Sequence, residues 1–133
     1  MLDVMIDLET LSTSPNAVIL TIGALKFKRH TRFRSSTLPS FYRRIEIQSC
    51  VDLGLDISSE TKKWWSMQNN KARHEAFEHK DRIPLAQALK ELSEWFRGSK
   101  YIWSHGATFD CVILEQAYHA CDLPVPWMFY DVR

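Results

Sequence analysis

Two acidic residues near the start of the chain, Asp7 and Glu9, are the first candidates for chemistry. They form the only Asp-x-Glu in the sequence and lie within an otherwise apolar stretch. Residues two apart on a strand share a face, and neighbouring carboxylates raise the pKa of at least one of them unless a cation neutralises the pair. Such hard oxygen ligands suit Mg²⁺ or Mn²⁺. The pattern therefore indicates either a metal site or, equally, a strand-end pair neutralised by Arg or Lys.

A third acid, Asp110, follows a turn that contains glycine. A buried strand ending at Ser104 breaks at Gly106, and the turn presents Asp110 where the next helix begins. An isolated Asp at this position most often caps a helix or interacts with its dipole. Asp110 therefore becomes a candidate site residue only in combination with Asp7 and Glu9.

The elements that must position these acids follow from apolar spacing. Val4, Ile6 and Leu8 alternate with the acids, which predicts a strand with the carboxylates on one face. Two further strands with short links predict an antiparallel meander, and a mixed α/β fold follows from the helices and the later strand. The predicted strands are 3–9, 18–27, 40–47 and 101–104, and the predicted helices are 58–69, 85–96 and 109–121.

Length and composition predict one domain over residues 1–133. The chain is 45% hydrophobic and 25% charged, without a linker or repeat. It has neither an apolar run long enough for a membrane helix nor a signal-peptide start, so we expect a cytoplasmic protein that does not bind membranes. The net charge of +1 gives no overall attraction to nucleic acid. One basic cluster could face phosphates or could equally be a solvated hairpin: Lys26, Lys28, Arg29, Arg32, Arg34, Arg43 and Arg44.

Two adjacent tryptophans form a second candidate for substrate binding. Trp64 and Trp65 follow Lys62 and Lys63, and aromatic faces beside cations suit the stacking of a single-stranded base next to its phosphate. Tryptophan is more often a core residue, and neighbours on a helix point about 100° apart. At most one ring is therefore expected to face a substrate, and we favour Trp65.

Taken together, these motifs resemble the DEDD (DnaQ-like) superfamily of 3′-5′ exonucleases. Residues 7–10 (Asp-Leu-Glu-Thr) resemble its first motif, and residues 109–114 (Phe-Asp-Cys-Val-Ile-Leu) resemble its second. With Trp64-Trp65 and residues 106–110, the chain resembles a subgroup of phage-type exodeoxyribonuclease VIII-like proteins and a bacterial 3′-5′ exoribonuclease. The resemblance implies a ribonuclease H-like fold, in which a mixed sheet has an antiparallel three-stranded meander followed by helices and a parallel strand.

The resemblance also implies a mechanism and a substrate. Two ions of Mg²⁺ or Mn²⁺ would clamp the terminal phosphodiester at the 3′ end of single-stranded DNA or RNA. Asp7 would bridge the ions, and Glu9 and Asp110 would supply further ligands. Thr10 and Leu11 would hold the terminal nucleotide through a backbone contact and an apolar wedge.

The family's third motif, an Asp preceded by His or Tyr, is not found in residues 1–133, so we expect an incomplete domain. Tyr118 lies about 12 Å along the helix from Asp110, too far to share its metals. We interpret His105 as a strand-end histidine beside the substrate rather than as the catalytic base.

The absent third motif favours a rival hypothesis, a degenerate nuclease fold that binds nucleic acid or a protein partner without cutting. An incomplete sheet flank would also expose apolar surface and favour a homodimer or domain swapping. A third hypothesis, an unrelated α/β binding domain, predicts no stabilisation by metal.

Overall fold

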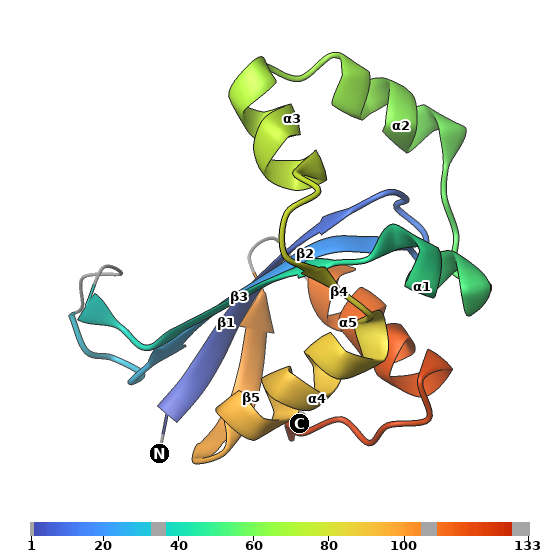
Figure 1. Cartoon of the computed structure of the whole chain (residues 1–133). Coiled ribbons are helices and arrows are strands. Elements are labelled where there is room, and N and C mark those ends of the chain that lie inside the picture. The colour runs from blue at the N-terminus through green and yellow to red at the C-terminus, as the bar shows by residue number, and fades with distance from the viewer. Residues whose placement is uncertain (1, 33–36, 105–108, 129–133) are drawn as a thin grey trace.

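The computed structural model shows a five-stranded mixed sheet flanked by helices (Figure 1) and describes residues 2–32, 37–104 and 109–128. The strand order is β4-β3-β2-β1-β5. The strands are β1 (Leu2–Thr10), β2 (Ile19–Phe27), β3 (Ser40–Ile45), β4 (Arg82–Ile83) and β5 (Ser99–Ser104). The helices are α1 (Ile47–Asp52), α2 (Ser59–Ser66), α3 (Asn70–Phe77), α4 (Leu85–Phe96) and α5 (Phe109–Ala120).

The sheet combines an antiparallel meander with two parallel pairs. β1 pairs antiparallel with β2, and β2 pairs antiparallel with β3. β5 then adds to the other edge of β1 in parallel, and the short β4 adds to β3 in parallel. The predicted mixed α/β fold, with a meander followed by helices and a parallel strand, is confirmed.

One face of the sheet carries the core. Val4, Ile6 and Leu8 of β1 are buried there, as the alternation of apolar residues predicted. Helices α4 and α5 cover this face: Trp95 of α4 packs on Phe41 of β3, at 5.6 Å between ring centroids. The buried residues of α4 recur at helical spacing, and the helix has the predicted bounds: Leu85, Ala88, Leu89, Leu92 and Phe96.

Helices α2 and α3 form an arm that stands away from the other helices (Figure 1). The hydroxyl of Ser58 accepts a hydrogen bond from the Thr61 N–H, which caps the first turn of α2 as predicted. The indole Nε1 of Trp65 donates to the Thr10 carbonyl at 2.9 Å. This bond ties the arm to the end of β1.

A second connection between the arm and the sheet comes from one guanidinium group. Arg82 donates hydrogen bonds of 2.6–3.0 Å to four backbone carbonyls. Two of these carbonyls belong to strands β2 and β3, and the other two lie at the end of α3. Each carbonyl would otherwise need another donor. Arg82 therefore joins β2, β3 and α3 through these acceptors: Leu20, Ile45, Ala76 and Glu78.

Several predicted boundaries are wrong. The third strand ends at Ile45 instead of reaching residue 47, because Glu46 is the N-cap residue of α1 and Ile47 is the first residue of that helix. The helix that begins after Ser58 stops at Ser66 instead of reaching residue 69, because the chain turns there into α3. Neither α3 nor β4 was predicted. No helix among the described residues is long and apolar enough to cross a membrane.

Candidate active site

Asp7 and Glu9 lie in a cavity of about 400 Å³ between the sheet and the arm. Asp7 is exposed and Glu9 is half-buried, and both project from the face of β1 opposite the core. Gly23 stands opposite Asp7 in the strand pairing and leaves the floor of the cavity open. The other lining residues come from β2, β3, α2 and α3: Thr21, Tyr42, Trp65, Ala72, Glu75 and Ala76.

Asp110 reaches the same strand because β5 is shorter than β1. β5 pairs with β1 only as far as Ser104, which lies opposite Ile6. Beyond the end of β5, the Leu8 N–H of β1 donates to the Asp110 carboxylate at 3.3 Å. Asp110 is 9% exposed in the first turn of α5. The structure thus brings the three predicted acids to one end of β1.

The three acids and Glu75 interact electrostatically. Burial raises the pKa of Glu9 above its ordinary value, and the charges of Asp7, Asp110 and Glu75 raise it further. Burial also raises the pKa of Asp110, and Asp7 adds to that rise against the opposing hydrogen bond from Leu8. Within the described ranges, Asp7, Glu9 and Glu75 form no ion pair with Lys or Arg. The alternative of a carboxylate pair neutralised by a basic side chain therefore finds no support there.

The carboxylates of Asp7, Glu9 and Asp110 are chemically suited to bind a hard divalent cation. Carboxylate oxygens are the ligands that Mg²⁺ and Mn²⁺ prefer, and a cation would offset the burial and the repulsion that raise the pKa values of Glu9 and Asp110. Among the residues whose placement is described, however, no three acidic, histidine or cysteine side chains lie close enough together to form a metal site as they stand.

A Glu9→Gln substitution should stabilise the metal-free protein at neutral pH, because it removes a carboxylate whose ionised form is disfavoured by burial and by neighbouring like charges. A carboxyl with a raised pKa in the folded state holds its proton more tightly there than in the unfolded chain. The free energy of unfolding therefore falls as pH rises from 4.5, the ordinary value for Glu, through the raised pKa. Urea unfolding in EDTA at pH 4 and pH 7 measures this effect. A gain that is equally large at pH 4 would contradict the explanation.

Sequence reasoning missed Glu75. It lies on α3, a helix in which only Ala76 is buried, so the apolar spacing that identified α4 is absent. A weaker signal was present, because Ala72 and Ala76 are four residues apart and mark the helix face turned toward the sheet. Glu75 is three residues after Ala72 and lines the cavity beside both alanines.

The structure changes the interpretation of Trp65. Trp65 lines the cavity, but only 5% of its surface is exposed. Its ring packs edge-on against Trp64 and Phe77, so it has no open face for stacking a base. Trp65 anchors α2 to Thr10, and Trp64 is the exposed ring of the pair, at 52%. A substrate-binding role for Trp65 stays a prediction.

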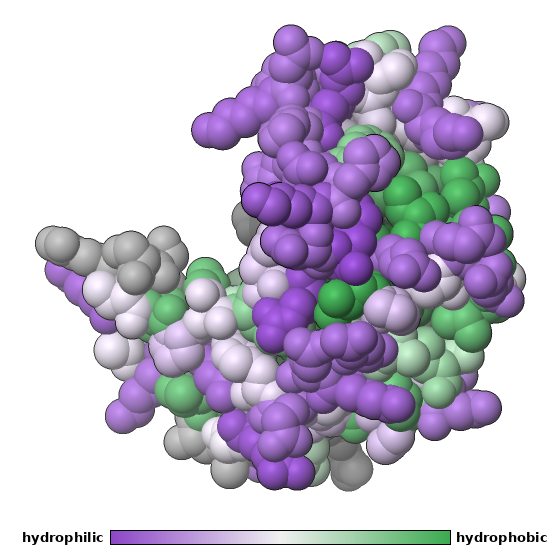
Figure 2. Space-filling view, in the orientation of Figure 1, coloured by the Kyte–Doolittle hydropathy of each residue, from purple (hydrophilic) through white to green (hydrophobic). Residues whose placement is uncertain are grey.

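The remaining predicted substrate residues have different environments. Thr10 is half-buried, and its hydroxyl donates to the Ser12 carbonyl at 2.8 Å. Leu11 is 4% exposed and lines an apolar groove with Ile57 and other residues. Figure 2 shows hydrophobic side chains gathered between α2 and α1, where this groove lies. Thr10 and Leu11 remain predictions for nucleotide binding, and His105 lies outside the described residues.

The basic cluster does not form one surface in the described part of the chain. The Lys26 ammonium lies 4.8 Å from the Trp95 ring centroid, and Arg43 pairs with Glu91, so both contact α4. Arg29 instead pairs with Asp3 on the opposite face of the sheet. Residues close in sequence diverge because neighbours on a strand point to opposite faces. Arg34 lies outside the described residues.

The chain resembles a known protein family over nearly its whole length. A protein-family model described as the 3′-5′ exoribonuclease Rv2179c-like domain matches residues 2–133. No curated protein matches the chain. The matched range includes every strand and helix of the sheet and arm, together with all three predicted acids. The predicted resemblance to a phage-type subgroup stays a prediction.

Proposed function

Because the chain belongs to the Rv2179c-like 3′-5′ exoribonuclease domain family, we propose that it is a metal-dependent nuclease that removes nucleotides from the 3′ end of single-stranded RNA. The observation that carries this proposal is the group of acids at the end of β1. Asp7, Glu9 and Asp110 come from two elements far apart in sequence, and burial together with the charges of Asp7 and Asp110 raises the pKa of Glu9. RNA is favoured over DNA by the description of the family.

In the proposed mechanism, Asp7, Glu9 and Asp110 would hold Mg²⁺ or Mn²⁺, as the resemblance to DEDD exonucleases implies. Two such ions would activate a water molecule and stabilise the leaving 3′ oxygen. Asp7 is the most accessible of the three carboxylates and would contact the metals from the centre of the cavity. The Leu8 N–H holds one Asp110 oxygen in place, which orients this carboxylate before substrate binds. Glu75 adds negative charge on the arm side and strengthens the attraction for cations.

The test is a cleavage assay with a 5′-labelled single-stranded RNA of about twelve nucleotides. With Mn²⁺ or Mg²⁺ we expect a ladder of labelled products that shorten one nucleotide at a time, and EDTA should abolish it. A DNA strand of the same sequence measures the preference for the 2′-hydroxyl. Labelled mononucleotide as the first product would contradict the proposed direction.

The rival function is a fold that binds nucleic acid without cutting. It is favoured by one observation, that no three metal-ligand side chains in the described ranges are already assembled. RNA binding without cleavage at millimolar Mn²⁺, and without any thermal stabilisation by Mn²⁺, would support this rival.

A further inference from the structure

The face of the sheet that bears Asp7 extends beyond the cavity toward the other end of β1. Asp3 and Met5 share this face with Asp7, because they are separated from it by an even number of residues. Trp103 of β5 stands opposite Met5, and Tyr42 of β3 stands opposite Gly23, the strand partner of Asp7. Helices α4 and α5 pack on the opposite face. Exposed parts of Tyr42 and Trp103 project from this one.

These aromatic side chains are accompanied by arginines, and we call the group the aromatic platform. The Arg29 guanidinium carbon lies 5.2 Å from the Tyr101 ring centroid and 5.4 Å from that of Trp103. The Arg44 guanidinium carbon lies 5.6 Å from the Tyr42 ring centroid. The aromatic platform thus has two parts. Tyr42 and Arg44 lie on β3, whereas Arg29, Tyr101 and Trp103 lie at β5 and the end of β2, with β2 and β1 between the two parts.

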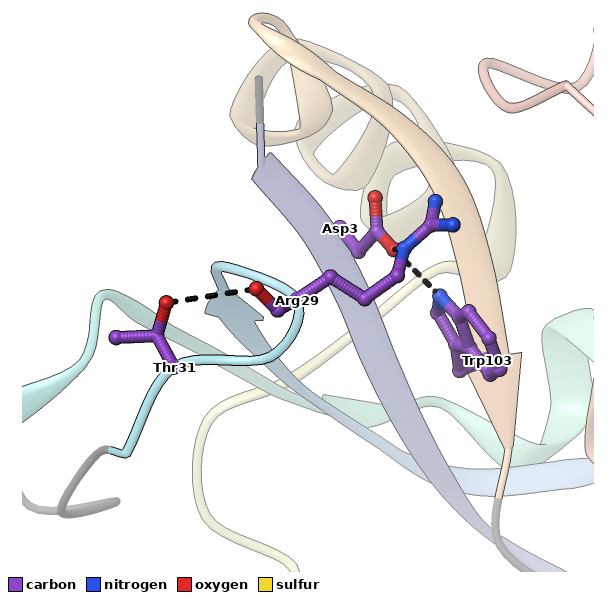
Figure 3. A network of polar contacts seen from close by, with 4 residues as sticks. All are labelled: Asp3, Arg29, Thr31 and Trp103. Atoms are coloured by element: carbon purple, nitrogen blue, oxygen red, sulfur yellow. Dashed lines mark hydrogen bonds and ion pairs between the residues drawn. The ribbon is translucent and has the colours of Figure 1, made fainter.

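A buried carboxylate fixes one side of the aromatic platform (Figure 3). Asp3 is 4% exposed, and one of its oxygens, Oδ2, accepts hydrogen bonds of 2.8 Å from both Arg29 Nε and Trp103 Nε1. These two hydrogen bonds hold the Arg29 guanidinium and the Trp103 indole in a defined arrangement, because moving either group would leave the buried Asp3 carboxylate without one of its partners. This part of the aromatic platform is therefore ordered before any ligand binds, which lowers the entropic cost of binding.

The exposure and charge of the aromatic platform suit a single-stranded nucleic acid. Trp103 is 38% exposed and Tyr42 is 43% exposed. Bases stack on aromatic rings whatever their sequence, and neighbouring arginines attract the phosphates. Tyr42 also lines the carboxylate cavity, and Trp103 lies across β1 from it, opposite Met5. Asp3 and Asp7 are four residues apart on β1, about 13 Å, so a strand entering the cavity could extend to the aromatic platform.

We propose that the aromatic platform binds the part of a single-stranded RNA that lies on the 5′ side of the nucleotide being removed. This inference rests on the proposed function, which places the 3′ end of the strand in the carboxylate cavity. The aromatic platform would then set the affinity for longer strands, whereas the cavity alone would hold a dinucleotide.

The test measures binding of fluorescently labelled RNAs of two and ten nucleotides in EDTA, which withholds the divalent ions needed for cleavage. The intact protein should bind the ten-nucleotide RNA more tightly than the dinucleotide. Tyr42→Ala and Trp103→Ala should each weaken binding of the longer RNA by about fivefold or more, since one stacked base contributes at least about 1 kcal/mol. Trp103→Ala should leave the dinucleotide affinity unchanged.

Matched variants separate stacking from folding. Trp103→Phe loses the same hydrogen bond to Asp3 as Trp103→Ala but keeps a ring, so it should retain binding of the longer RNA. Tyr42→Phe should do the same. Leu53→Ala removes a side chain with similar exposure, 42%, outside the aromatic platform and should change nothing. Equal affinities of the two RNAs for the intact protein, or unchanged affinity in both alanine variants, would overturn the inference.

The outcome also distinguishes this inference from the proposed function. If the intact protein cleaves RNA with Mn²⁺ but the alanine variants bind the longer RNA normally, only the aromatic platform is refuted. If the variants lose binding but no protein cleaves, the aromatic platform is supported and the nuclease function is refuted.

Discussion

An Asp7→Asn variant is expected to lose metal-dependent RNA cleavage by about 10³-fold or more. Metal ions at such sites supply several kcal/mol of transition-state stabilisation, and each 1.36 kcal/mol changes the rate about tenfold. Asp7 is the exposed carboxylate and interacts with both Glu9 and Asp110, so its replacement by a neutral amide should weaken metal binding strongly. Initial rates on 5′-labelled RNA at saturating Mn²⁺ measure the loss.

The same variant provides a measurement that does not depend on activity. Mn²⁺ at about 100 times its dissociation constant should stabilise the intact protein by about 2.7 kcal/mol, or about 8 °C in melting temperature for a chain of this size. Asp7→Asn should abolish this shift. Asp52→Asn is the control, because Asp52 is an exposed acid of α1 whose contact with Gln48 an amide oxygen can keep. A shift that persists in Asp7→Asn would place the metal elsewhere.

Replacement of Arg82 by alanine should have the largest effect on stability. Its guanidinium supplies the donors for four backbone carbonyls, and a hydrogen bond to a charged group contributes about 1.5–3 kcal/mol. Water can reach part of this half-exposed site, so we expect a total loss of about 3 kcal/mol, or roughly 10 °C in melting temperature. Urea unfolding followed by circular dichroism measures the loss.

Two further variants test the geometry of the Arg82 contacts. Arg82→Lys should recover only part of the stability, because an ammonium group cannot reproduce the planar fork of a guanidinium. Arg97→Ala removes a 76% exposed arginine that pairs with Glu94 on the surface of α4, and it should change stability by less than about 0.5 kcal/mol. Similar losses in Arg82→Ala and Arg97→Ala would show that the four carbonyl contacts contribute little.

The parts of the fold that the sequence predicted are those with local signals. Helix α4 has Pro84 at its N-cap and an apolar face at helical spacing, and its bounds were predicted in full. β1 was predicted from the alternation of Val4, Ile6 and Leu8. By contrast, α3 buries only Ala76 and depends on its Asn69 cap and on Arg82. Contacts between residues far apart in the sequence leave no periodic signal in it.

The candidate site divides in the same way. Asp7 and Glu9 share a face because of strand geometry, which the sequence alone implies. The approach of Glu75 depends on how the arm folds over the sheet, and no spacing encodes it. The burial of Trp65 has a similar origin, since Thr10 and Phe77 contact it from other elements. Motifs thus identified acids that carry chemistry, whereas tertiary packing determined their neighbours.

The hydrogen bond between Leu8 and Asp110 has a consequence for the order of folding. It joins residues 102 positions apart, so the entropy of closing a long loop must be overcome before it forms. The hairpin of β1 and β2 is local and can form earlier, when Asp7 and Glu9 are present without Asp110. A newly synthesised chain would therefore carry only part of its acidic group until α5 docks, and the proposed RNA cleavage would begin only after that late step.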